Sequence, residues 1–160
     1  TKMKSRRNSM VVSAAVIAAV LLGSLAYSHC QIPCGIYGDE GRFEMIGEHI
    51  TTIEKSMKTI EALSGAEKPN MNQIVRWVNN KDEHADALSE IVTYYFMAQR
   101  VKLPAEGDAE ARAQYVKQLT LLHEMLVYSM KAKQTTDMDN VEKLKIALSK
   151  FHDVYFHDAN

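Results

Sequence analysis

The fold of this 160-residue chain is decided by FEMIGEHITTIEKSMKTI, residues 43–60. Large apolar side chains recur in this stretch at alternating intervals of three and four residues. That spacing places them on one face of an amphipathic α-helix, which must be buried against other elements. Asp39 and Glu40 lie just before the stretch, where negative charge favours a helix N-terminus, and Ser64-Gly65 predicts its end. The predicted core positions are Phe43, Ile46, Ile50, Ile53, Met57 and Ile60.

Three later segments show the same periodicity and are separated by turn-forming residues. A polar loop through Pro69 follows the first helix, Pro104 and Gly107 follow the second, and residues 134–137 offer an N-cap to the last. No alternating β pattern of useful length competes, so we predict an all-α protein, an antiparallel up-and-down four-helix bundle over residues 38–160. The predicted core positions are Ile74, Val78, Ala85, Leu88, Val92 and Tyr95 in a helix that runs to about Val101, then Val116, Leu119, Leu122, Leu126 and Met130, and finally Val141, Leu144, Leu148, Phe151 and Tyr155.

The composition predicts a single globular domain behind a distinct N-terminal segment. Apolar residues make up 46% of the chain, and its net charge is −1. The small net charge hides an asymmetry, because residues 1–28 contain four basic residues and no acidic residue. The rest of the chain is therefore mildly acidic, which gives no reason to expect nucleic acid as a partner.

Residues 1–28 have the pattern of a cleaved export signal. A basic start is followed by an apolar run from Met10 to Leu25, and the small residues Ala26 and Ser28 predict a cut before His29 by a leader-processing peptidase. The run is interrupted and short, so we expect no stable membrane span after cleavage, although an uncleaved signal anchor is the alternative. Export predicts the periplasm, the thylakoid lumen or the extracellular space, and the cytoplasm fits only if the leader is a maturation propeptide.

Residues 29–37, HCQIPCGIY, contain both cysteines of the chain and form the segment that we call the hook. Pro33 and Gly35 supply turn chemistry between and after the two thiols. A cut before His29 would expose an α-amine beside its imidazole, and Cys30 would add an amide nitrogen and a thiolate. Together with the thiolate of Cys34, these donors suit nickel(II) or copper(II) in a square-planar field. A disulfide between the two cysteines is the ordinary alternative in an exported chain.

The motif His-Cys-x-x-Pro-Cys-Gly-x-Tyr, with histidine as the new N-terminus, resembles the nickel hook of the nickel-containing superoxide dismutases. The likeness continues through Arg42-Phe43-Glu44 and more loosely over the helical body. The resemblance implies a four-helix bundle assembled as a homohexamer, with one nickel ion per subunit bound by His29, Cys30 and Cys34. It also implies a reaction that converts superoxide to oxygen and hydrogen peroxide while nickel cycles between Ni(II) and Ni(III).

The same resemblance assigns roles to residues around the hook. Tyr37 corresponds to a tyrosine at the substrate entrance that hydrogen-bonds small anions or water. The alternative is an aromatic side chain that anchors the hook to the bundle, and the two roles are compatible. Glu44 corresponds to a glutamate that orients the N-terminal imidazole, the alternative being an exposed glutamate of the first helical turn. His84 stands where some members have an arginine, and in its protonated form it could pair with Glu44. Tyr95 is a weaker match for a second tyrosine near the site.

Two other classes of protein compete with the dismutase, and a third is nearly excluded. A nickel- or copper-binding protein without turnover could use the same hook, and a structural helical domain could close it with a Cys30–Cys34 disulfide. A ferritin-like di-iron bundle needs Glu three residues before His on two helices, and no histidine of the helical body has that neighbour.

A nine-residue hook has too little surface to shield its own thiolates from oxidation, so oligomerisation is expected to cover it.

Overall fold

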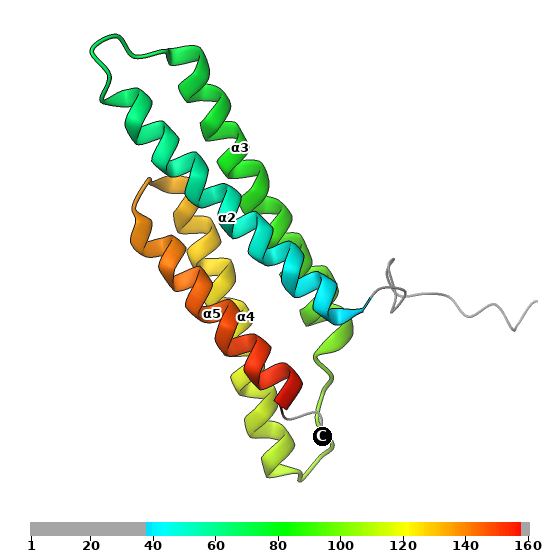
Figure 1. Cartoon of the computed structure of the whole chain (residues 1–160). Helices are drawn as coiled ribbons and strands as arrows, with labels where there is room; N and C mark the ends of the chain where they lie inside the picture. Colours follow the sequence, from blue (N-terminus) through cyan, green and yellow to red (C-terminus); the bar gives the residue numbers. More distant parts are fainter. Residues whose placement is uncertain (1–37, 158–160) are drawn as a thin grey trace, which may run out of the picture. The chain divides into compact units, whose positions relative to one another are not determined.

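The computed structural model describes residues 38–157, which fold into a bundle of helices without a strand among them (Figure 1). Helix α2 spans Asp39–Ser64, α3 spans Met71–Glu90, α4 spans Ala109–Gln134 and α5 spans Met138–His157. A π-helix, η2, continues α3 from Ile91 to Arg100. Successive helices run antiparallel, and α2 packs against both α3 and α5, while α4 packs against α3 and α5. The predicted antiparallel four-helix bundle is therefore confirmed.

Local hydrogen bonds explain where the helices begin. The side chain of Asn70 accepts a hydrogen bond from the backbone N–H of Gln73 at the start of α3, and Asp108 accepts one from Ala111 at the start of α4. Before α5, the carboxylate of Asp137 accepts a hydrogen bond from the N–H of Asp139. These side chains replace the intrahelical partners that the first N–H groups lack. The N-cap predicted within residues 134–137 is thus present.

The predicted stripe of α2 forms the centre of the core. All six of its apolar side chains are buried, the most exposed being Ile60 at 8%. Towards the N-terminal end of α2, Phe43 packs between helices, with its ring centroid 4.9 Å from that of Phe96 and 5.3 Å from that of Phe151. Burying rings of this size supplies much of the hydrophobic stabilisation available to a bundle of this length. This aromatic packing joins α2, η2 and α5 at one end of the bundle.

The predicted core face of α4 was partly wrong. Val116 and Met130 are 48% and 51% exposed, whereas Ser129 and Ala132 are fully buried together with Leu122 and Met125. Ser129 occupies a core position because its hydroxyl donates to the carbonyl oxygen of Ala85 on α3, at 2.7 Å. A buried hydroxyl is tolerated when it is hydrogen-bonded in this way. Apolar residues also lie on the outer face of α4, so hydrophobicity alone did not identify its inner face.

The second predicted helix ends at Arg100, one residue before the predicted end near Val101, and its last ten residues adopt π geometry, which the sequence did not predict. The wider turn places adjacent residues on the core side, so that Ile91 and Val92, and then Tyr95 and Phe96, are buried in pairs. Short π segments inside α-helices often accompany functional sites. Here the π-helix ends at Arg100, beside the residues that follow the hook. In residues 38–157, no helix is both long and apolar enough to cross a membrane.

Candidate metal centre

The four predicted hook residues His29, Cys30, Cys34 and Tyr37 lie outside the described residues. The described part of the centre is therefore the end of the bundle to which the hook is covalently attached. Gly38 is the N-cap of α2, and Asp39 is its first residue, two positions after Tyr37. Whatever fixes Asp39 also fixes the point at which the chain leaves the bundle towards the hook.

Asp39 is fixed by side chains from two other elements. Its Oδ1 accepts a hydrogen bond of 2.5 Å from the hydroxyl of Tyr95, and its Oδ2 accepts one of 2.7 Å from the hydroxyl of Tyr155. The guanidinium of Arg100 forms an ion pair with the same carboxylate. We call these four residues the Asp39 cluster. It ties the first residue of α2 to η2 and to the C-terminal part of α5.

The electrostatics of the cluster favour a charged Asp39. Burial alone would raise the pKa of its carboxyl group, but the hydrogen bonds from Tyr95, Arg100 and Tyr155 outweigh burial and lower it. Burial and the hydrogen bond to Asp39 raise the pKa of Tyr95 to about 12. The pKa values of Tyr155 and Arg100 are raised as well, chiefly by burial for the tyrosine and by the bond to Asp39 for the arginine. At neutral pH the cluster is therefore a carboxylate with three donors.

A second contact links the first turn of α2 to α5. The carboxylate oxygens of Glu40 lie 3.0 Å and 3.2 Å from Nε2 of His152. The imidazole of His152 also packs edge-on against Phe43, with a centroid distance of 5.0 Å. Sequence reasoning treated Asp39 and Glu40 only as charges that favour a helix N-terminus. Their position directly after the hook was the signal that they also hold its base.

Tyr95 was predicted to lie near the site, and it contacts Asp39, the first residue of α2 after the hook. It is 4% exposed, its hydroxyl is bonded to Asp39, and the guanidinium carbon of Arg42 lies 5.1 Å from its ring centroid. The ring is thus held between a cation and the core. This arrangement suits Tyr95 to positioning the start of α2.

The structure does not bring Glu44 and His84 together. Nδ1 of His84 lies 2.8 Å from Nδ1 of His49, so its partner on α2 is a histidine. Glu44 is exposed and lies five residues before His49 on α2, which corresponds to about 7.5 Å along the helix axis. Whether either residue contacts the hook stays a prediction, since the hook lies outside the described residues.

The donor chemistry points to the hook as the place for a redox metal. Within residues 38–157, no group of three or more His, Cys, Asp or Glu side chains is arranged to hold a metal ion. Both cysteines belong to the hook, and thiolates with nitrogen donors are a set that suits nickel or copper. The residues of the hook therefore fit the metal that their motif predicts.

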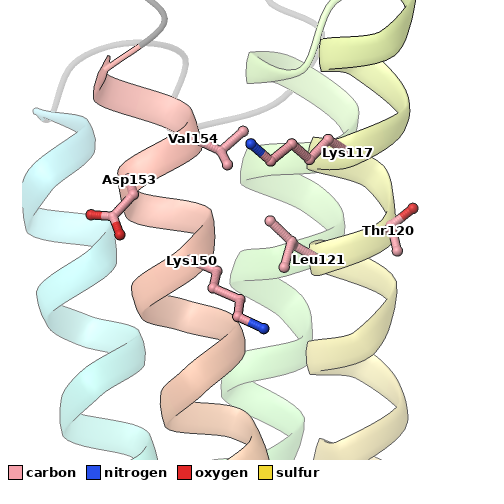
Figure 2. A pocket seen from close by; sticks show the side chains of 6 residues that line it. All are labelled: Lys117, Thr120, Leu121, Lys150, Asp153 and Val154. Carbon is pink, nitrogen blue, oxygen red and sulfur yellow. The ribbon is translucent and has the colours of Figure 1, made fainter.

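A groove of about 430 Å³ between α4 and α5 is a poor alternative site (Figure 2). Leu121 and Val154 line it, and Lys117 reaches from α4 towards Val154 on α5. Lys150, Thr120 and Asp153 are its polar lining residues. It contains neither a histidine nor a thiol, so it offers no donor set for a transition metal.

Comparison with known proteins agrees with the hook motif and with the bundle. The family model for nickel-containing superoxide dismutase matches residues 24–159, which include the hook and every described helix. No curated protein and no solved structure gives a match. Because the match covers most of the 160 residues, the chain belongs to the nickel-containing superoxide dismutase family, and it is a nickel-dependent oxidoreductase that acts on superoxide.

Proposed function

We propose that this dismutase becomes active when a peptidase cuts between Ser28 and His29, and that the exposed hook then binds one nickel ion per subunit. His29 would contribute its α-amine and imidazole, Cys30 its amide nitrogen and thiolate, and Cys34 its thiolate. The observation that carries the proposal is the family match, which spans the whole hook and begins only five residues before His29. When bound, nickel supplies the one-electron exchange, cycling between Ni(II) and Ni(III), by which one superoxide is oxidised to oxygen and another is reduced to hydrogen peroxide.

The protein's own residues then have separate tasks. Tyr37 stands at the substrate entrance and holds the incoming anion or a water molecule by its hydroxyl, and Glu44 orients the imidazole of His29. The Asp39 cluster fixes the base of the hook. Tyr95 belongs to that cluster as a positioning residue, because a phenol with a pKa of about 12 keeps its proton at neutral pH and donates it to Asp39 in a hydrogen bond. Water held at the hook would supply the two protons that peroxide needs.

We further propose that the active enzyme is an exported homohexamer. The oligomer would bury each hook against a neighbouring subunit and protect its thiolates from oxidation to sulfenic or higher acids. The outer face of α4, where Val116 and Met130 are exposed, offers apolar surface for such contacts. The leader of residues 1–28 supports export to the periplasm, the thylakoid lumen or the extracellular space.

Nickel-loaded protein that begins at His29 tests the function directly. The account expects superoxide dismutation that is abolished by Cys30→Ser and by Cys34→Ser, with unchanged helicity in circular dichroism because the buried residues that hold the helices together between Phe43 and Val154 are kept. A protein that binds nickel without turnover would instead be a metal carrier. A metal-free form with no titratable thiols would indicate the disulfide-closed domain. The first result would refute the proposed activity, and the second would refute the proposed metal site.

A further inference from the structure

His49 on α2 and His84 on α3 form a pair of imidazoles that the proposed reaction does not explain. Their Nδ1 atoms are 2.8 Å apart, and their ring centroids are 5.0 Å apart with planes inclined by 59°. Both residues are half-buried at the seam where α2 and α3 lie side by side (Figure 1). His49 is ten residues beyond Asp39, which corresponds to about 15 Å along α2 from the start of the helix.

The separation of the two nitrogens matches that of two ligands on one metal ion. Imidazole nitrogens bind zinc at about 2.0–2.1 Å, so two of them in neighbouring coordination positions lie roughly 3 Å apart. In the hydrogen-bonded pair, an N–H of one ring points at the lone pair of the other, and removal of that hydrogen leaves two lone pairs that converge on the same space. A metal ion can therefore take the place of the shared hydrogen after a small rotation of the rings.

The surroundings of the pair leave His49 able to act as a ligand. Burial, and then the neighbouring His84, lower the pKa of His49, which keeps its imidazole neutral and able to ligate near pH 7. Glu48 is the acidic group whose charge acts on His49.

We propose that His49 and His84 form a second metal site, which takes a divalent transition ion that prefers imidazole ligands, such as zinc or copper(II). The ring that donated the hydrogen bond would shift its proton from Nδ1 to Nε2, so that both Nδ1 atoms ligate and no net proton is released. Within residues 38–157 the pair is not accompanied by a third such ligand in metal-holding geometry. Water completes the coordination, and the ion is exchangeable while it cross-links α2 to α3.

The test uses untagged, nickel-loaded enzyme so that the hook is already filled, and zinc is the probe. Native mass spectrometry should show one zinc per subunit in addition to the hook's nickel, and thermal unfolding should shift to higher temperature with zinc. Both effects should be lost in His49→Gln and, separately, in His84→Gln. They should persist in the control His123→Gln, whose histidine is exposed on α4.

Each result decides the proposal. Absence of additional zinc in the nickel-loaded wild type would overturn it. Zinc that is retained by both glutamine variants, or lost in His123→Gln, would identify adventitious surface binding and would overturn it as well. Circular dichroism of the two glutamine variants establishes that they are folded before zinc is added. The nickel content, measured in the same spectra, reports the hook separately, so failure of this site and failure of the proposed function are distinguishable.

Discussion

Arg100, the last residue of the π-helix η2, forms an ion pair with Asp39, the first residue of α2, 61 positions earlier in the chain. The contact closes one end of the bundle at the point where the hook is attached. The hydroxyls of Tyr95 and Tyr155 donate hydrogen bonds to the same carboxylate. A metal-binding segment can hold reactive geometry only if its base is fixed, and this cluster fixes the residue that follows the hook by two positions.

Replacing Asp39 by Asn should destabilise the protein by about 1–3 kcal/mol, because hydrogen bonds to a charged group are lost and the positive charge of Arg100 loses its partner. Urea unfolding measures this change. The exposed Asp153 on α5 provides the control, since Asp153→Asn should change the free energy of unfolding by about 0.5 kcal/mol or less. If Asp39→Asn has stability and nickel content equal to those of the control, the cluster does not hold the hook.

Tyr95→Phe separates a positioning role from a catalytic one. The variant keeps the buried ring and removes only the donor to Asp39, so we expect a loss of about 1 kcal/mol in stability. Activity normalised to bound nickel should stay unchanged, while the nickel occupancy falls. A normal nickel content with a large fall in kcat would instead show that the hydroxyl acts on superoxide. Tyr155→Phe, which removes the donor to the other carboxylate oxygen, is the matched comparison.

The cluster also predicts how stability depends on pH. The pKa of Asp39 is lowered from its ordinary value of 3.8, so its contribution is present above that value and is lost as the pH falls through the lower folded-state pKa. The pKa of Tyr95 is raised from 10.0 to about 12, so its contribution is present below pH 10 and is lost as the pH rises towards 12. Denaturant midpoints measured across both ranges should show these losses in the wild type and weaker losses in Asp39→Asn. Parallel curves for the two proteins would contradict this assignment.

Phe43→Ala should be far more damaging than a nearby surface change. Phe43 is 4% exposed and packs against Phe96 and Phe151, so truncation should lower the free energy of unfolding by about 3–5 kcal/mol. Met45 lies two residues later and is 39% exposed, and Met45→Ala should change that free energy by about 0.5 kcal/mol or less. Thermal unfolding of both variants measures the contrast. Similar losses in the two variants would argue against the aromatic core described here.

The bundle could be predicted from the sequence because it depends on short-range order, and the stripe of α2 repeats every turn. The predicted ligands of the hook also lie within nine residues, and their role stays a prediction. The inner face of α4 was harder to identify, because Ser129 becomes a core residue only through the carbonyl of Ala85, 44 positions away. The Asp39 cluster and the His49–His84 pair were missed for the same reason. Helix packing brings the side chains of each group together, and the residue type at one position does not indicate which distant residue it will contact.

A native mass spectrum of protein expressed with residues 1–28 and supplied with nickel tests the central claim most directly. One spectrum reports the N-terminus, the metal content and the assembly. The account predicts a chain that begins at His29, with one nickel per subunit in a hexamer. A chain that retains residues 1–28, or a metal-free species lighter by two hydrogens from a Cys30–Cys34 disulfide, would contradict it.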